Sequence, residues 1–434
     1  MQMANDRSDT MRARRLVGRP LVSVWLAALV MGCSANLPPM PTATAEGTAT
    51  VAEATPAEAT PAGGTQGPTT PAPSSFPSTS ASPIPSQAAS EWVVRDVPEY
   101  TTTGGADLTR TVDGSTGYVH VVVSNLEEAW EGFNDASVYL RTEDDGRTWS
   151  KRLLVGGMFP QLASSGRHVY LAYEAYACGG GIGVLRNDQH GLRRAWAPVS
   201  CVTPSGSVGS EGSPAIAASG KLVYVAASND TNGRIVAHVS RDRGRTWSHV
   251  RLGSAHETDG FPGGLVKVAA TRDLAAVAWT DRDRTLVRVS TDAGRHWGRT
   301  TLLAAGGVTA GSGAGPRLAF TGATRDGLPW LRVRRDDGTW ERVALPGGRL
   351  GAGSVALGDA ASITYAACGF ELPDGSIGPS TWVTSSDGET GVSRGSLPQC
   401  DATDPMLLAV DGQSYLVAGA TGEDDYTYGL AASP

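Results

Sequence analysis

The sequence predicts an all-β fold of the β-propeller class, with seven blades or, as the alternative, six. A hairpin motif that usually ends in Trp recurs at intervals of about fifty residues, and short strand-like runs lie between its copies. Four short strands in a repeat of this length are typical of a propeller blade. No long apolar stripe of period 3.6 is present, which disfavours a mainly helical fold.

The clearest copy of the motif runs from Ser240 to Trp247 between two strand-like runs, so the chain must reverse there. The Ser240 hydroxyl and the Asp242 carboxylate can accept hydrogen bonds from backbone N–H groups, and Gly244 can adopt positive φ. Trp247 offers a flat apolar anchor. We predict a structural role for these residues and for their counterparts in two more copies: Thr142, Asp144, Gly146 and Trp149, and Ser290, Asp292, Gly294 and Trp297.

Looser copies are predicted at residues 188–196, 336–340 and 384–391. The motif resembles the Asp-box, or BNR repeat, of sialidases and other β-propellers. This resemblance implies that the boxes lie on the edge of the propeller away from the ligand face, where they stabilise the fold.

Strand-like runs at the two ends of the predicted propeller indicate how its ring of blades is closed. Residues 405–434 supply three strand-like runs, one fewer than a blade needs, and residues 92–97 have the form of the strand that follows each box. We expect this N-terminal strand to complete the last blade and remove exposed sheet edges. The blade around Gly306–Gly315 is the weakest in sequence, because nearly all of its residues there are small.

The chain is expected to have three parts. Residues 1–33 combine a basic start with an apolar run too short to span a bilayer, which predicts a secretory signal. Residues 30–33 resemble a bacterial lipobox, which implies a lipid on Cys33 that anchors an exported protein to the cell membrane; a plain signal peptide is the alternative. The Pro, Thr, Ala and Ser composition of residues 34–90 predicts a disordered stalk. Residues 91–434 are expected to form the propeller.

Four further cysteines are available for disulfides in an exported chain. Cys178 and Cys368 follow second strands, whereas Cys201 and Cys400 follow fourth strands, and both strand ends lie on the same edge of a blade. We therefore expect the pairs Cys178–Cys201 and Cys368–Cys400. The sequence has no CxxC pair and no His/Cys cluster, so no metal and no cofactor are predicted.

The upper loops, which join strands two and three or lead to the next blade, are expected to form the ligand face of a propeller. They carry many acids and scattered aromatics, which suit a glycan or a protein ligand; solvated connections are the alternative interpretation. The net charge of −7 opposes nucleic-acid binding. The candidate ligand-binding residues are Trp130, Glu131, Tyr176, Glu257, Asp259, Phe261, Asp281 and Arg282.

The resemblance to sialidases implies a catalytic set of three arginines that bind the sugar carboxylate, an Asp that protonates the leaving group, and a Tyr activated by a Glu. The arginines that can face a central pocket are Arg110, Arg282, Arg284 and Arg317, and none lies in an Arg-Ile-Pro motif. We therefore predict a monomeric, surface-anchored recognition propeller that binds glycan or protein. A sialidase-like exo-glycosidase is the alternative, and an assembly or scaffolding factor for a membrane complex is the second.

Overall fold

The computed structural model describes parts of the compact unit formed by Ala81–Pro434. The described residues are 93–101, 106–125, 136–150, 153–203, 213–229, 232–256, 266–345, 349–350, 353–358, 362–367, 370–371, 377–378, 381–385, 393–396, 406–410, 413–421 and 426–432. The predictions for Cys33 and for residues 1–90 lie outside these ranges.

The described chain is nearly all β, in antiparallel sheets. Three four-stranded sheets follow one another in sequence order. The first contains β9 (Ala215–Ser219), β10 (Leu222–Ser228), β11 (Arg234–Ser240) and β12 (Ser248–Ser254). The second contains β13 (Val266–Thr271), β14 (Leu274–Asp281), β15 (Arg284–Ser290) and β16 (Thr301–Ala305), and the third contains β17 (Gly307–Ala314), β18 (Arg317–Ala323), β19 (Pro329–Arg334) and β20 (Trp340–Val343). The predicted all-β fold of four-stranded antiparallel sheets is confirmed.

Two further four-stranded sheets come from the C-terminal part of the chain. One contains β22 (Gly353–Leu357), β23 (Ile363–Ala367), β26 (Thr381–Ser385) and β27 (Ser393–Ser396). The other has the order β1 (Val93–Thr101), β30 (Tyr426–Ala432), β29 (Gln413–Thr421) and β28 (Met406–Val410). A small additional sheet consists of β21 (Arg349–Leu350), β24 (Phe370–Glu371) and β25 (Ile377–Gly378).

The remaining sheet has seven strands because one long strand serves two four-stranded halves. Its members are β2 (Ala106–Asp113), β3 (Thr116–Asn125), β4 (Ala136–Thr142), β5 (Leu153–Ser165), β6 (His168–Ala175), β7 (Gly181–Asn187) and β8 (Ser200–Cys201). The first four residues of β5 pair with β4, and the rest of the strand pairs with β6. Strand β5 is therefore the outer strand of one half and the inner strand of the next.

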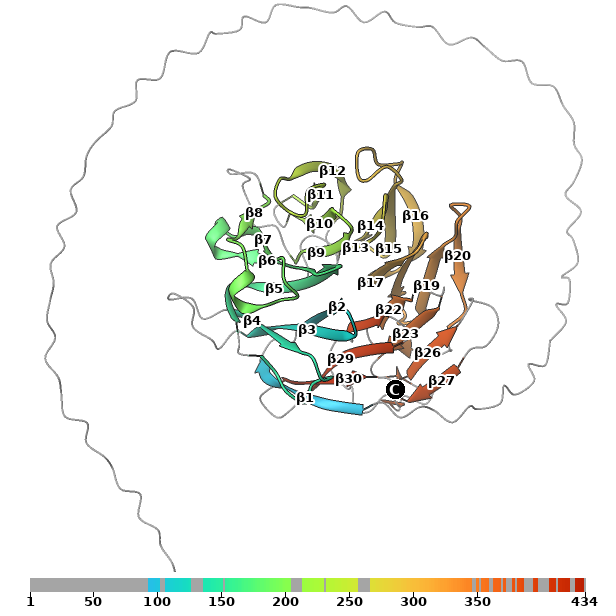
Figure 1. Cartoon of the computed structure of the whole chain (residues 1–434). Coiled ribbons are helices and arrows are strands. Elements are labelled where there is room, and N and C mark those ends of the chain that lie inside the picture. The colour runs from blue at the N-terminus through green and yellow to red at the C-terminus, as the bar shows by residue number, and fades with distance from the viewer. Residues whose placement is uncertain are drawn as a thin grey trace, which may run out of the picture. The chain divides into compact units, whose positions relative to one another are not determined.

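The inner strands contact one another in sequence. Strand β2 contacts β5, β5 contacts β9, and the order continues through β13, β17, β22 and β28, which contacts β2. Figure 1 shows the sheets side by side around a common centre, with β2, β9, β17 and β22 close to it. This radial order of sheets is the β-propeller arrangement. Apolar clusters between neighbouring sheets form the core, such as the cluster of Tyr224, Ile235, Leu252, Val268 and Trp279.

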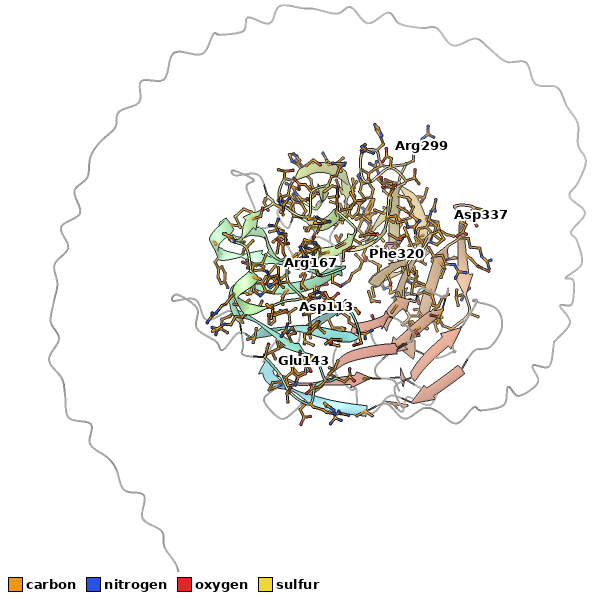
Figure 2. The ribbon with its side chains drawn as sticks, viewed as in Figure 1. Asp113, Glu143, Arg167, Arg299, Phe320 and Asp337 are labelled. Carbon is orange, nitrogen blue, oxygen red and sulfur yellow. A yellow bond between two sulfur atoms is a disulfide. The ribbon has the colours of Figure 1, made fainter. Side chains whose placement is uncertain are left out.

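Each sheet has two edges that differ in their connections. We call the edge where the inner strands begin the upper edge; it also carries the hairpins between second and third strands, such as the one from Asp281 to Arg284. The lower edge carries the hairpins between third and fourth strands. Arg299 lies in the connection between β15 and β16, and Asp337 lies in the hairpin between β19 and β20. Figure 2 shows both residues at the periphery of the sheets.

The motif hairpins are closed by short hydrogen bonds within five residues. The Ser240 hydroxyl accepts a bond from the Gly244 N–H at 2.7 Å and donates to Asp242 at 2.8 Å. The Asp242 carboxylate accepts the Thr246 N–H at 2.8 Å, and Gly244 has a φ of 77°. The hairpins that start at Thr142 and Ser290 contain the same three bonds, made by their equivalent residues. Local chemistry alone therefore closes these hairpins.

A fourth hairpin reaches the same geometry with a different side chain. Asn187 occupies the position of the hydroxyl residue, and its Oδ1 accepts the N–H groups of Gln189 at 2.9 Å and Gly191 at 3.0 Å. Its Nδ2 donates to the Leu192 carbonyl at 2.7 Å. The motif here therefore begins at Asn187, where an amide replaces the expected Ser or Thr, and Gln189 rather than Asp188 occupies the Asp position.

The segment Gly306–Gly315, whose sequence gave the weakest indication of a strand, contains β17. A Cβ atom at Gly313 would lie 2.5 Å from the Ala270 carbonyl oxygen of β13, and one at Gly311 would lie 2.7 Å from the Phe320 ring. Small residues are required here because the backbone of the neighbouring inner strand β13 and the Phe320 ring of β18 approach this closely.

The helices among the described residues are two 3-10 turns, Tyr176–Cys178 and Arg193–Ala195. In the described part of the chain, no helix has the length and apolar character needed to cross a membrane.

Candidate functional site

A central cavity of about 410 Å³ lies among six inner strands, β2, β5, β9, β13, β17 and β22. Small side chains of β9 and β17 form much of its wall, including Ala215, Ala217 and Ala310. Three charged side chains also line it: Asp107, Arg110 and Lys267. Asp107 and Lys267 are each the second residue of their strands, so both lie near the upper end of the cavity.

Asp107 connects two neighbouring inner strands. Its Oδ1 accepts the Leu108 N–H at 2.8 Å, and its Oδ2 accepts the Leu162 N–H at 2.6 Å. Desolvation raises the pKa of this carboxyl to about 6, against the opposing effects of the two backbone hydrogen bonds and of Lys267. The upper part of the cavity therefore holds a carboxylate that titrates in the range used by proton-transfer groups.

A second polar cluster lies on the upper edge between the sheets of β12 and β14. Asp281 is 3% exposed, and its Oδ1 accepts bonds from the His256 backbone N–H at 3.0 Å and from His256 Nδ1 at 2.9 Å. Its Oδ2 accepts a bond from Arg284 at 2.8 Å. Desolvation acts to raise the pKa of Asp281, but the hydrogen bonds from Arg284 and His256 outweigh it and lower the pKa to about 2.

This cluster fixes the start of one upper loop. His256 is the last described residue before residues 257–265, and Val266 begins β13 immediately after them. The loop therefore leaves from the Asp281 cluster and returns beside Lys267, at the central cavity. Three of the predicted ligand residues, Glu257, Asp259 and Phe261, belong to this loop and lie outside the described residues.

The structure places three of the eight predicted ligand residues. Asp281 is buried and engaged by His256 and Arg284, so it joins the end of the described chain after β12 to the β14–β15 hairpin. Arg282 is exposed at the tip of the same hairpin, with a φ of 59°. Tyr176 is half-buried in the 3-10 turn that follows β6. Trp130 and Glu131 lie outside the described residues.

The four candidate arginines do not form one group. Arg110 lines the central cavity. Arg282 and Arg284 belong to the β14–β15 hairpin on the upper edge, whereas Arg317 begins β18 at the β17–β18 hairpin on the lower edge. Arg317 is thus at the opposite end of its sheet from Arg282 and Arg284. Arg284 is engaged by Asp281, and the Arg110 guanidinium lies against Gly117 of β3, so these residues do not supply three convergent guanidinium groups.

A disulfide joins Cys178 and Cys201, the first of the two expected pairs, with Cα atoms 5.4 Å apart. It links the 3-10 turn after β6 to β8 on the upper edge. Cys368 and Cys400 lie outside the described residues. Among the described residues, no group of three or more His, Cys, Asp or Glu side chains is placed to hold a metal ion.

Sequence reasoning missed Phe159, an exposed aromatic on the upper part of β5. Its side chain is 45% exposed and its φ is 52°. The available signal was the length of the run: β5 has 13 residues, longer than any other described strand, and includes a Phe-Pro pair. That combination indicates two strands joined by an irregularity rather than one.

A second cavity, of about 240 Å³, lies between β4 and the hairpin that contains Gly191. Tyr139 forms its inner wall, and its hydroxyl lies 2.7 Å from Nδ1 of His120, whose Nε2 lies 2.9 Å from the Thr111 hydroxyl. Desolvation, followed by the charge of Arg141, lowers the pKa of His120 to about 3. His120 is therefore neutral at physiological pH, and the chain of hydrogen bonds is structural.

The sequence matches no protein-family model and no curated protein. Among solved structures, a sialidase of Trypanosoma rangeli in complex with the inhibitor DANA shares 15% identity over 76% of this chain and 55% of that chain, with a TM-score of 0.41. The chain thus spans about half the length of that sialidase. SapL1 lectin in complex with alpha methyl fucoside shares 15% identity over 70% of this chain and 99% of that chain, with a TM-score of 0.42. A mutant Aleuria aurantia lectin in complex with alpha-methyl-L-fucoside shares 14% identity over 69% of this chain and 96% of that chain, also with a TM-score of 0.42.

Proposed function

We propose that this chain is a seven-bladed recognition propeller that binds a glycan at its upper edge, above the central cavity. The observation that carries this proposal is the polar upper part of the cavity, where Asp107 and Lys267 project from two different inner strands. Cavities of about 300–1,000 Å³ hold small ligands, and this one has about 410 Å³. A sugar suits such a site because its hydroxyl groups both donate and accept hydrogen bonds.

Ring closure by the N-terminal strand supports the count of seven blades. Strand β1 pairs with β30, with Val93 opposite Ala432. The Trp149 indole N–H donates to the Asp96 carbonyl at 3.2 Å, and Gly146 lies against Arg95 and Leu430. The first motif hairpin thus packs on the sheet that contains β1. Five four-stranded sheets and the two halves of the seven-stranded sheet then make seven blades.

The second candidate is a sialidase-like exo-glycosidase. One observation favours it: Asp107 has a pKa raised to about 6 and lies in a cavity, as a general acid requires. A role as an assembly or scaffolding factor is a third candidate. It predicts that no small ligand binds in the central cavity.

The test uses the full-length protein on an array of neutral, fucosylated and sialylated oligosaccharides, together with a fluorogenic sialoside. We expect binding of at least one oligosaccharide, a roughly tenfold loss in Lys267→Ala, and no hydrolysis. The matched control is Lys221→Ala, which removes a Lys from the lower hairpin between β9 and β10. Hydrolysis of the sialoside makes the chain an enzyme. Failure to bind any oligosaccharide overturns glycan recognition and favours a protein ligand.

We further propose that the chain is exported, carries a lipid on Cys33, and presents a monomeric propeller on the stalk of residues 34–90. The Cys33→Ser variant should move from the membrane fraction to the soluble fraction without a change in its unfolding midpoint. Light scattering of this soluble variant should give the mass of one chain. A variant that stays in the membrane fraction contradicts the lipid anchor.

A further inference from the structure

Phe159 adopts a backbone conformation that is unfavourable for its residue type. Its φ of 52° lies in the left-handed region, which large side chains rarely occupy. Pro160 follows it, and a proline restricts the preceding residue to extended conformations. The position therefore costs free energy that the neighbouring structure must offset.

The neighbouring strands hold this conformation in place. Strand β5 is irregular here, because its pairing with β6 shifts between Met158, opposite Glu174, and Gln161, opposite Ala172. Two residues before Phe159, Gly157 has a φ of 150°, and a Cβ atom there would lie 2.0 Å from the Glu174 carbonyl oxygen. The backbone on both sides is thus fixed by close packing and by the sheet.

Burial of the ring does not explain why a Phe occupies this position. The side chain is 45% exposed, one of few large apolar side chains so exposed among the described residues. A glycine would adopt the same φ without strain. A strained residue that keeps a large exposed ring is the pattern expected where the ring contacts a ligand.

Phe159 lies close to the polar part of the central cavity. Gln161 lines the cavity, and the Leu162 N–H donates to Asp107 at 2.6 Å. Three residues of extended chain span at most about 10 Å, so the Phe159 backbone lies within about that distance of the Leu162 N–H. A pyranose ring with its hydroxyl groups is comparable in size to this separation.

We propose that Phe159 is the stacking platform for a pyranose ring whose hydroxyl groups bind at Asp107 and Lys267. The apolar C–H face of the sugar lies on the aromatic ring, and its polar edge enters the cavity. This inference rests on the proposed glycan recognition and adds the residue that selects a ligand with one apolar face.

The test measures binding to the same oligosaccharide array by full-length Phe159→Ala, Phe159→Gly and Phe159→Trp proteins. We expect the Ala and Gly variants to lose at least tenfold in signal on the oligosaccharide that the wild type binds best, and the Trp variant to retain it. The control is Leu302→Ala, which removes a 66% exposed apolar side chain from the outer strand β16. It should bind like the wild type.

Thermal unfolding tests the backbone strain at Phe159. Both small variants lack the ring, but glycine relieves the strain at positive φ, so Phe159→Gly should unfold about 2 °C above Phe159→Ala. Unchanged binding in both variants, alongside a weakened Lys267→Ala, overturns the stacking role and leaves the proposed function standing. If the wild type binds no oligosaccharide, both proposals fail.

Discussion

Asp281 holds the upper edge together with a single carboxylate. It joins the connection after β12 to the β14–β15 hairpin through four donor atoms, two of His256 and two of Arg284, and its burial strengthens each contact. Because its folded pKa of about 2 lies below the value of about 3.9 expected in the unfolded chain, the folded state favours the ionised form.

The Asp281→Asn variant should lose stability at neutral pH. The depressed pKa contributes about 2 kcal/mol to the free energy of unfolding above about pH 4, and this contribution disappears as the pH falls towards 2. Urea unfolding of wild type and variant between pH 2 and 7 measures it. The control is Asp283→Asn, in the same hairpin but exposed. A deficit that stays constant over this pH range contradicts the role of the charge.

Residues whose partners are close in sequence could be predicted, and those with distant partners could not. The bonds of Ser240 and Asp242 span at most four residues, so the motif alone specifies the hairpin. Asp107 binds Leu162, 55 residues away, and nothing near Asp107 in the sequence indicates this contact. Likewise, Phe159 becomes notable only once its exposure and its φ are known.

At the level of elements, hydroxyl groups connect the lower ends of neighbouring inner strands. Ser165, the last residue of β5, accepts the Gly220 N–H at 2.7 Å, and Ser219, the last residue of β9, accepts the Arg272 N–H at 2.7 Å. Thr271, the last residue of β13, donates to the Gly315 carbonyl. Each strand end is thus bonded to the hairpin of the next sheet.

The Ser219→Ala variant should test one of these links. It leaves the Arg272 N–H without its Ser219 acceptor, so the free energy of unfolding should fall by about 1 kcal/mol. Urea unfolding with an unchanged slope provides the measurement. Ser213→Ala, which removes an exposed hydroxyl just before the same strand, should remain within about 0.5 kcal/mol of the wild type. Equal effects of the two substitutions would show that the link contributes nothing.

Element boundaries were less predictable than element types. The two strand-like runs on either side of the Ser240 hairpin are formed as β11 and β12, because the strand pattern and the hairpin motif agree there. Strand β5 was not recognised as one continuous strand shared by two sheet halves, because sharing depends on the packing of those halves. Strand β17 gave little apolar signal, because the approach of β13 selects small residues.

At the level of the whole molecule, β1 connects the two ends of the described chain. Val97 is 5% exposed and shares an apolar cluster with Leu108 and Leu430. This cluster joins the sheet completed by β1 to the sheet that begins with β2. The pairing of β1 with β30 agrees with the expectation that residues 92–97 form an outer strand of this sheet.

Two substitutions on β1 measure the contribution of this closure. Val97→Asp places a charge in the cluster and should lower the free energy of unfolding by roughly 3 kcal/mol or more. Val94→Asp adds the same charge at a 44% exposed position of the same strand and should change it by less than about 1 kcal/mol. Thermal unfolding and light scattering of both variants give the comparison. If Val97→Asp unfolds at the wild-type midpoint, β1 is not needed for closure.

The direction of β1 determines how the propeller would carry mechanical load. Val93 pairs with Ala432 at the lower edge, and Thr101 pairs with Tyr426 at the upper edge, so β1 runs the full height of its sheet. If the chain is tethered through its N-terminus and holds a ligand on the upper edge, tension acts along β1. The β1–β30 hydrogen bonds are then loaded together in shear rather than opened one by one, the geometry in which a strand pair resists force best.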